Sequence, residues 1–288
     1  MMDGIINVNK PTGMTSHDVV YRLRRILGVK KIGHTGTLDP DASGVLPMCV
    51  GKATKLADYL TATDKQYRAE LSLGAFTDTQ DASGEVLERF DVNVTEKQLR
   101  DVLCEFVGEI EQIPPMYSAL KVNGQKLCDL ARKGRQVERQ PRPVTVHELT
   151  LLSREGDTLH LRVRCSKGTY IRTLCADIGE ALGCGGCMQA LRRTQAGEYT
   201  IAEAVPLQQL LESPEPETYL RDVDTMFRGY PGVKLTVNQE KRCRNGNAFS
   251  VTLPAGTYRA YSQSGEFLML AKVEDGVMST IKSFFDVQ

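Results

Sequence analysis

The pattern of apolar residues changes near residue 230 of this 288-residue chain, and this change limits the possible folds strongly. Before it, segments with helical spacing alternate with segments in which every second residue is apolar. After Tyr230–Gly232 only short β-like runs remain, separated by the turn sequences "NGN", "PAG", "QSG" and "EDG". This order predicts an α+β domain over residues 1–228 and a small β-barrel over residues 229–288.

The helical segments carry start and stop signals. Thr15 or Ser16 can cap a helix that buries one apolar face and ends at Gly28. Thr95 can cap a second helix in "TEKQLRDVLCEFVGEI", and "LCADIGEALG" and "AVPLQQLLES" predict two more. The segment "KQYRAELSLG" alternates like a strand, and Asn123–Gly124 predicts a hairpin.

Several classes of protein are disfavoured by the composition. The longest apolar run is far too short to cross a bilayer, and "MMDGIINVNKP" has no apolar core of a secretory signal, so the cytoplasm is the expected location. Eight scattered Cys then favour buried, reduced thiols. The close pair Cys184–Cys187 in "CGGC" suits a zinc or redox site only weakly and a glycine-rich loop better.

Charge is segregated although the net charge is zero. Residues 20–31 carry five basic and no acidic side chains, and residues 128–142 carry five basic and two acidic ones. Residues 203–224 carry six acidic side chains and one basic one. Either a face that binds a polyanion or ordinary solvated helix surfaces would give this distribution.

The segment "GHTGTLDPDASGVLP", from Gly33 to Pro47, has neither helical nor strand periodicity and contains His34, Asp39 and Asp41. Its residues alone favour a turn in which Asp and Ser oxygens cap backbone amides. The pattern D-x-D-x-S is also that of an aspartyl phosphatase nucleophile, although no buried strand precedes it and no acidic pair for Mg²⁺ follows. A His–Asp metal site lacks a third ligand at usable spacing.

A resemblance to a known family changes this interpretation. "INVNKPTGMTSHDVV", "GHTGTLDPDASGVLP", "GKATKLADYL", "DKQYRAELSLGAFTDTQDASGEV", "IPPMYSALKVNGQKL", "CSKGTYIRTLCADIGEALGCGG" and "LRRTQAGEY" follow one another through residues 4–200. In content and order they resemble the conserved blocks of the TruB-type tRNA pseudouridine synthases. The resemblance implies a pseudouridine synthase fold with a mixed, mainly antiparallel sheet and flanking helices. The tail is similar in pattern to the PUA-like RNA-binding domain of that family.

The resemblance also implies catalytic roles. Pseudouridine formation breaks the N1–C1′ bond of uridine, turns the base and rejoins it through C5. By family position, Asp39 is the carboxylate that acts at C1′ or C6, and Arg172 keeps its pKa low. Tyr67 is implied to stack on the base and to help move the C5 proton. Asp41 is expected to have only a structural role in the turn.

Five further residues are implied to bind the substrate. The target, uridine 55 in the T loop of tRNA, must leave its stack to react, and His34 matches the residue that fills the vacated space. Tyr170 and Leu191 would line the pocket, and Lys10 and Lys55 would hold the loop or the RNA backbone.

The resemblance implies the T stem-loop of tRNA as partner, no metal or other cofactor, no guide RNA and a monomer. Two alternatives on the same scaffold stay open at this point. One is a catalytically idle RNA-folding factor, and the other is a synthase directed by a guide RNA, whose longer basic extensions this chain lacks.

Overall fold

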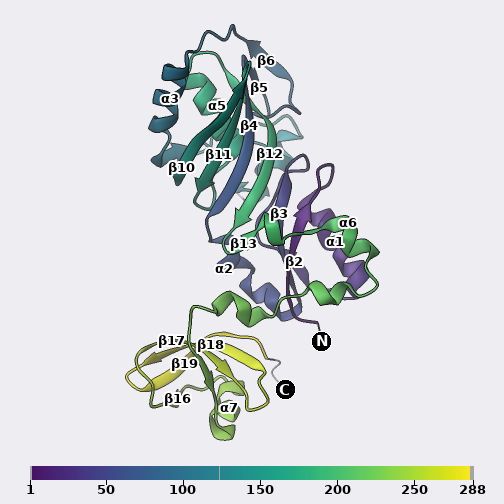
Figure 1. Cartoon of the computed structure of the whole chain (residues 1–288), viewed down its shortest axis with the longest axis vertical. Helices are drawn as coiled ribbons and strands as arrows, with labels where there is room; N and C mark the ends of the chain where they lie inside the picture. Colours follow the sequence, from purple (N-terminus) through teal and green to yellow (C-terminus); the bar gives the residue numbers. More distant parts are fainter. Residues whose placement is uncertain (1, 123, 286–288) are drawn as a thin grey trace.

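The computed structural model describes residues 2–122 and 124–285, and it contains one large sheet and a smaller C-terminal sheet (Figure 1). The large sheet has ten strands. In spatial order its main path is β14 (Val205–Pro206), β1 (Gly4–Lys10), β3 (Ser43–Val50), β12 (Gly186–Ala196), β4 (Lys65–Leu73), β11 (Thr158–Cys165), β10 (Arg142–Glu155) and β7 (Gly108–Gln112). β2 (Ile32–His34) pairs with β3, and β13 (Tyr199–Thr200) pairs with β12.

Only two pairs in this sheet, β1 with β14 and β3 with β12, are parallel among the described residues. The predicted mixed, mainly antiparallel α+β architecture is therefore confirmed. The main core lies between the large sheet and the helices α1 (Ser16–Leu27), α3 (Glu96–Glu105), α5 (Ile171–Ala181) and α6 (Leu207–Glu212). In the described part of the chain, the helices α2 (Ala57–Thr61), α4 (Leu127–Ala131) and α7 (Val237–Arg244) contribute no residue to this core. The 3-10 turns are η1 (Gly51–Leu56), η2 (Ile201–Glu203), η3 (Pro216–Tyr219) and η4 (Val223–Phe227).

Local signals set the limits of α1 as predicted. The Thr15 side chain accepts a hydrogen bond from the Asp18 amide, the Asp18 carboxylate accepts one from the Thr15 amide, and Gly28 ends the helix at φ 65°. Between the two predicted caps, Thr15 is the one used. Ser16 is instead buried, and its hydroxyl joins α1 to the loop before β3.

The helix predicted over "TEKQLRDVLCEFVGEI" is longer than the helix in the structure. The helix α3 begins at the predicted Thr95 cap but ends at Glu105, and residues 108–112 form β7 instead. Gly108 has a φ of 111°, which a helix excludes, and β7 gains its hydrogen bonds by pairing with β10. The long-range pairing therefore outweighs the local helical pattern.

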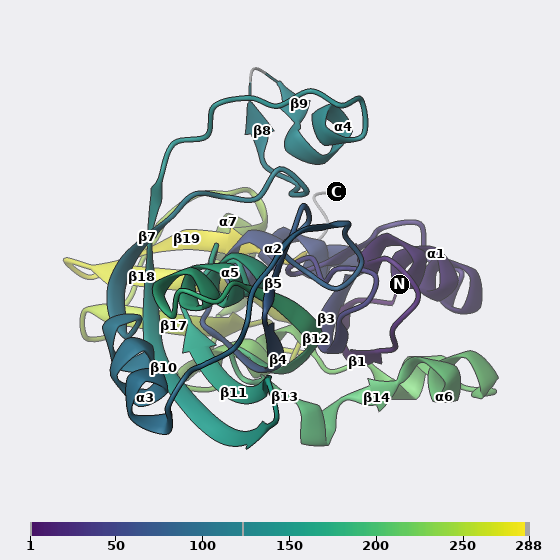
Figure 2. The same ribbon diagram turned by 90° about the horizontal axis from the view of Figure 1, so that it is seen from above.

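Two small hairpins project from the sheet. β5 (Ala75–Thr77) pairs with β6 (Val86–Arg89), and β8 (Lys121–Val122) pairs with β9 (Gln125–Lys126). The predicted hairpin at Asn123–Gly124 joins β8 and β9, although Asn123 itself lies outside the described residues. Seen from above, β8, β9 and α4 stand away from the rest of the molecule on a long excursion between β7 and β10 (Figure 2).

The C-terminal sheet has the order β15 (Gly232–Lys234), β17 (Gly256–Tyr261), β18 (Phe267–Glu274), β19 (Val277–Ser283) and β16 (Phe249–Ser250). It has its own core, and the strand order leaves edges at β15 and β16, so it is a curled half-barrel (Figure 1). A separate apolar cluster that contains Phe227 and Phe284 joins this sheet to η1 and α2. The relation to a PUA-like domain and the boundary at residue 228 stay predictions.

All eight Cys are free, and six of them are buried. Cys184 precedes β12 and Cys187 lies within it, on either side of Gly185 at φ 68°. None of the described helices is long and apolar enough to span a membrane.

Candidate active site

The loop between β2 and β3 presents Asp39 at the surface of the large sheet. Ser16 Oγ accepts a hydrogen bond from the Leu38 amide at 2.8 Å and donates one to the Leu38 carbonyl at 3.0 Å. The Ala42 amide donates to the Asp39 carbonyl at 3.1 Å and closes a turn. The Asp39 side chain keeps 40% of its surface exposed, so a substrate can reach the carboxylate.

Arg172 in the first turn of α5 joins three separate segments. Its Nε lies 3.0 Å from Asp39 Oδ2 and its Nη1 lies 3.4 Å from Asp81 Oδ2. Nη1 also donates to the Thr79 carbonyl at 3.2 Å, and Nη2 donates to the Tyr117 carbonyl at 2.9 Å. The side chain is only 6% exposed, so these contacts hold a buried cation beside Asp39.

Burial and charge act in opposite directions on Asp39. Burial raises the pKa of the carboxyl above its ordinary value, the charge of Arg172 lowers it, and Asp81 raises it. Arg172 therefore acts on the pKa in the expected direction, but burial outweighs it. The expected low pKa of Asp39 is not what the environment produces.

Asp81 lies in the turn between β5 and β6 and was not singled out from the sequence. Asp81 Oδ1 accepts hydrogen bonds from Thr79 Oγ1 at 2.7 Å and from Ser83 Oγ at 2.6 Å, while Oδ2 faces Arg172. Gln80 before it has a φ of 64°, which few residues adopt without support. The tetrapeptide "DASG" occurs at residues 41–44 and again at 81–84, and this repetition was the available signal.

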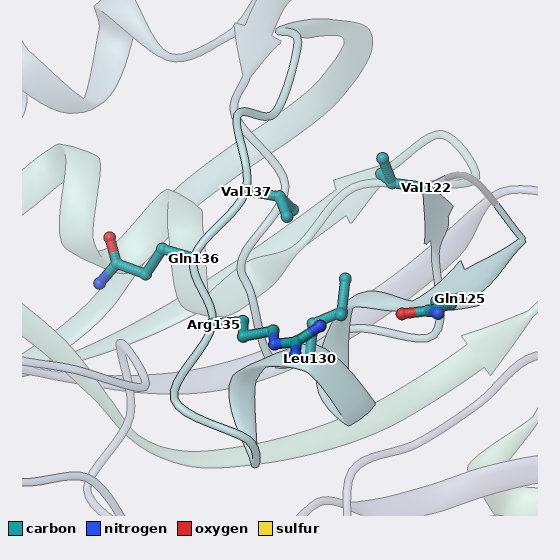
Figure 3. A pocket seen from close by; sticks show the side chains of 6 residues that line it. All are labelled: Val122, Gln125, Leu130, Arg135, Gln136 and Val137. Atoms are coloured by element: carbon teal, nitrogen blue, oxygen red, sulfur yellow. The ribbon is translucent and has the colours of Figure 1, made fainter.

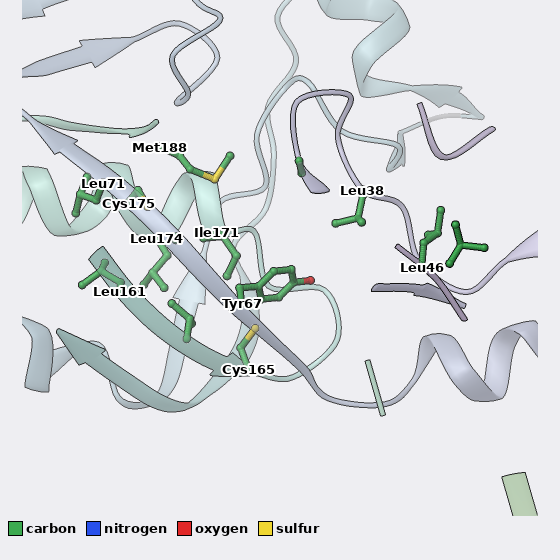
Figure 4. Packing of buried hydrophobic residues seen from close by; sticks show 14 of the residues in the cluster. Leu38, Leu46, Tyr67, Leu71, Leu161, Cys165, Ile171, Leu174, Cys175 and Met188 are labelled. Atoms are coloured by element: carbon green, nitrogen blue, oxygen red, sulfur yellow. The ribbon is translucent and has the colours of Figure 1, made fainter. Parts of the chain in front are cut away.

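Tyr67 lies on β4, buried in the main core with Ile171 and Cys165 (Figure 4). Burial raises the pKa of its hydroxyl, while charge and a hydrogen bond from Arg193 lower it. The charge of Asp39 is a smaller cause that raises this pKa, so the carboxylate lies within electrostatic range of Tyr67. The structure thus puts Asp39 in contact with Arg172 and Tyr67 in the same region, and the catalytic roles of the three residues stay predictions.

Arg193 on β12 was not singled out from the sequence. It is 1% exposed, and among the described residues no carboxylate forms an ion pair with it. Its Nε donates to the Val45 carbonyl at 2.7 Å and its Nη2 donates to the Gly36 carbonyl at 3.1 Å. Arg193 therefore connects both ends of the Asp39 loop with Tyr67.

Tyr170 and Leu191 lie on the elements that carry Arg172 and Arg193. Tyr170 precedes α5, and its backbone exchanges two hydrogen bonds with the Gln112 side chain, at 2.9 and 3.2 Å. Leu191 is half-buried on β12, opposite Ala69 of the Tyr67 strand. Their placement is compatible with the predicted pocket wall.

Lys10 and His34 contact the Asp39 loop. Lys10 is fully buried and donates to the carbonyls of Pro11, Met14 and Pro40 at 2.8, 2.7 and 3.1 Å. Burial lowers the pKa of Lys10 to about 8. Since three protein carbonyls use the three N–H groups of Lys10, the geometry favours the loop-holding role over a contact with RNA. His34 is half-buried, and burial and the charge of Arg193 lower its pKa, which favours the neutral ring.

Lys55 lies away from these residues. Its Nζ on η1 donates to the Ser283 carbonyl of β19 at 2.9 Å, where the two sheets meet. A contact between Lys55 and RNA stays a prediction.

A surface hollow of about 360 Å³ lies in the excursion between β7 and β10 (Figure 3). It is lined by Val122, Gln125, Leu130, Arg135, Gln136 and Val137, and by none of the residues placed around Asp39.

Within residues 2–122 and 124–285, no group of three His, Cys, Asp or Glu side chains could hold a metal ion.

Comparisons with known proteins agree on one family. The model "TruB family pseudouridylate synthase (N terminal domain)" matches residues 24–171, and "tRNA pseudouridylate synthase B C-terminal domain" matches residues 172–224. A protein of Clostridium kluyveri named tRNA pseudouridine synthase B is 44% identical over 98% of this chain and 100% of its own length. A protein of the same name from Clostridioides difficile is 47% identical over 86% of this chain and 84% of its own.

A solved structure supports the same relationship. The protein chain in the structure titled "Structure of H/ACA RNP bound to a substrate RNA containing 2'-deoxyuridine" is 25% identical to this chain and superposes with a TM-score of 0.72. The match covers 99% of this chain and 86% of that one.

Proposed function

The chain belongs to the TruB family of pseudouridylate synthases and is a tRNA pseudouridine synthase, and we propose that it converts uridine 55 of the T loop with Asp39 as its nucleophile. The observation that carries this proposal is the contact between Asp39 and the buried Arg172 beside Tyr67. It provides a reachable carboxylate, a fixed cation and an aromatic ring at one place, which are the groups that the reaction needs.

The reaction is an isomerisation, so no atom or electron enters or leaves. Asp39 attacks C1′ or C6 of the uridine, and the N1–C1′ bond breaks. The turned base forms a bond from C5 to C1′, and the bond to Asp39 breaks, which regenerates the carboxylate. The proton on C5 leaves, and N1 gains one. The charge of Arg172 supports the ionised form of Asp39, and the buried guanidinium is already oriented toward the carboxylate before the substrate binds.

The uridine has to leave the T loop before this chemistry. The half-buried His34 lies at the edge of the Asp39 loop, and we assign it the space that the extruded base vacates. Tyr67 would stack on the base, with Tyr170 and Leu191 as walls. The protein recognises the phosphate backbone and the loop shape of the tRNA through the basic segments 20–31 and 128–142. The proposal also includes that no guide RNA is needed and that the protein is a monomer in the cytoplasm.

Residues 229–288, which contain the C-terminal half-barrel, are proposed as a PUA-like RNA-binding unit. The last turn of α7 carries the exposed Lys241 and Arg242. Replacing both with Glu in the full chain should weaken tRNA binding and reduce the salt dependence of the dissociation constant. Unchanged affinity and salt dependence would contradict this assignment.

One experiment tests the main proposal. The protein is incubated with an unmodified tRNA transcript in the presence of EDTA, and pseudouridine is mapped by primer extension after carbodiimide treatment. A stop at position 55 is expected with wild type and with Asp41→Asn, since Asp41 is exposed and has no assigned chemistry, but not with Asp39→Asn. Absence of the stop with wild type would favour the idle folding factor, and a stop only after a guide RNA is added would favour the guided synthase.

A further inference from the structure

Helix α1 extends the Asp39 loop along the surface. The two hydrogen bonds between Ser16 Oγ and Leu38 join the first turn of α1 to the residue that precedes Asp39. His17, the next residue, is exposed. Because Ser16 is hydrogen-bonded to Leu38, the adjacent His17 lies at the same junction between α1 and the Asp39 loop.

An exposed tyrosine continues this surface one helical turn further. The rings of His17 and Tyr21 meet edge to face, with centroids 4.7 Å apart and an interplanar angle of 83°. The Arg24 guanidinium carbon lies 5.8 Å from the centroid of the Tyr21 ring. Tyr21 nevertheless remains 59% exposed, so its neighbours orient the ring without covering it.

The surroundings of Tyr21 are strongly cationic. Residues 19–38 contain no acidic side chain, and Arg22, Arg25, Lys30 and Lys31 are all exposed. The nearby Asp18 is engaged in the helix cap with Thr15. This positive charge attracts a polyanion and repels a protein partner whose surface is positively charged.

We infer that Tyr21, oriented by His17 and Arg24, is a stacking platform for an unpaired base of the tRNA close to the target loop. An exposed aromatic ring among cations binds single-stranded nucleic acid, because each base has a flat face and each phosphate a charge. The inference rests on the proposed function, since it takes the tRNA beside Asp39 as the occupant. It adds a contact outside the pocket that holds the uridine.

Substitutions at Tyr21 separate stacking from other effects. In an Asp39→Asn background, which prevents turnover, Tyr21→Leu should raise the dissociation constant for an unmodified tRNA transcript by roughly 5- to 100-fold. Tyr21→Phe keeps the flat ring and should bind within about twofold of the parent. The slope of log Kd against log salt should be the same for both, because neither change removes a charge.

A fluorescence experiment observes the contact directly. The chain has no Trp, so Tyr21→Trp introduces a single reporter whose emission a stacked base should quench. The matched control is Leu152→Trp, at a residue 45% exposed on β10, which lies toward the opposite edge of the large sheet from β1 and far from α1 in Figure 2. Quenching by tRNA is expected for the first reporter and not for the second. Circular dichroism melts confirm that each variant is folded.

The outcomes distinguish the inference from the proposed function. Wild-type protein that forms pseudouridine at position 55, together with a Tyr21→Leu variant that binds tRNA as tightly as its parent, would overturn the platform alone. Equal quenching of both reporters, or a changed salt slope in Tyr21→Leu, would also overturn it. Loss of pseudouridine formation by wild type would overturn the proposed function.

Discussion

Arg172 bridges the carboxylates of Asp39 and Asp81, which come from separate loops. Asp39 lies in the loop between β2 and β3, and Asp81 lies in the turn between β5 and β6. The distances are 3.0 Å from Nε to Asp39 Oδ2 and 3.4 Å from Nη1 to Asp81 Oδ2. One buried guanidinium therefore couples the position of the proposed nucleophile to the turn over residues 77–84. The charge of Asp81, on the other side of this cation, is also one of the groups that raise the pKa of Asp39.

Asp81→Asn should move the acid limb of the pH–rate profile to lower pH. The pKa of Asp39 is raised above 3.8 in the protein, and Asp81 is one of the groups that raise it. Because the proposed nucleophile is the carboxylate, the rate falls as pH decreases through this pKa, and removal of the Asp81 charge lowers the pKa. Single-turnover rates across acid pH measure the limb.

Asp41→Asn is the matched control for this prediction, since Asp41 also raises the pKa of Asp39 but ranks after Asp81 among the causes. It should give a smaller shift in the same direction. A shift of the Asp81→Asn limb to higher pH would mean that Asp81 acts mainly by positioning Arg172.

Tyr67→Phe should slow the reaction by about 10²-fold while tRNA affinity stays close to that of wild type. The change keeps the ring and removes the hydroxyl, which shares a hydrogen bond with Arg193. Tyr67→Leu removes the ring as well and should be slower still. Tritium release from tRNA labelled at C5 of uridine measures the step, and a wild-type rate for Tyr67→Phe would contradict a role of the hydroxyl in moving the C5 proton.

Arg193→Lys should destabilise the protein by about 2–4 kcal/mol. A single ammonium cannot reproduce the two bonds from Nε to the Val45 carbonyl and from Nη2 to the Gly36 carbonyl. The free energy of unfolding in urea measures the loss. The control is Arg192→Lys, at the preceding, exposed position of β12, which should change the free energy of unfolding by less than about 0.5 kcal/mol. Equal values for the two variants would refute the role of Arg193 as a clamp.

Lys55→Met should cost about 1 kcal/mol of stability, because the Ser283 carbonyl loses the donor that lies 2.9 Å away. Limited proteolysis of the full chain should become faster in the C-terminal sheet, and Lys97→Met, on the exposed face of α3, should have no such effect. Weaker tRNA binding with unchanged stability would instead support the RNA contact that the family resemblance implied for Lys55.

Sequence patterns predicted the elements whose limits depend on neighbouring residues. The Thr15 cap and Gly28 end of α1 and the strand alternation around Tyr67 are decided within a few residues, by caps, backbone angles and side-chain period. The catalytic role of "GHTGTLDPDASGVLP" could not be predicted in this way, because its residues alone favoured a capped turn. The resemblance was needed to select Asp39 over Asp41.

The sequence patterns by themselves thus determined the α+β class and the local limits of α1, and the family resemblance added the candidates Asp39, Tyr67 and Arg172. The tertiary structure decided which charges meet. Arg172 contacts a turn 93 residues earlier in the chain, and Arg193 bonds to a carbonyl 157 residues away. It also ended α3 at Glu105 and placed Lys55 at the second sheet. Such contacts follow from strand pairing and burial across the whole chain, since a buried guanidinium needs acceptors that its sequence neighbours do not supply.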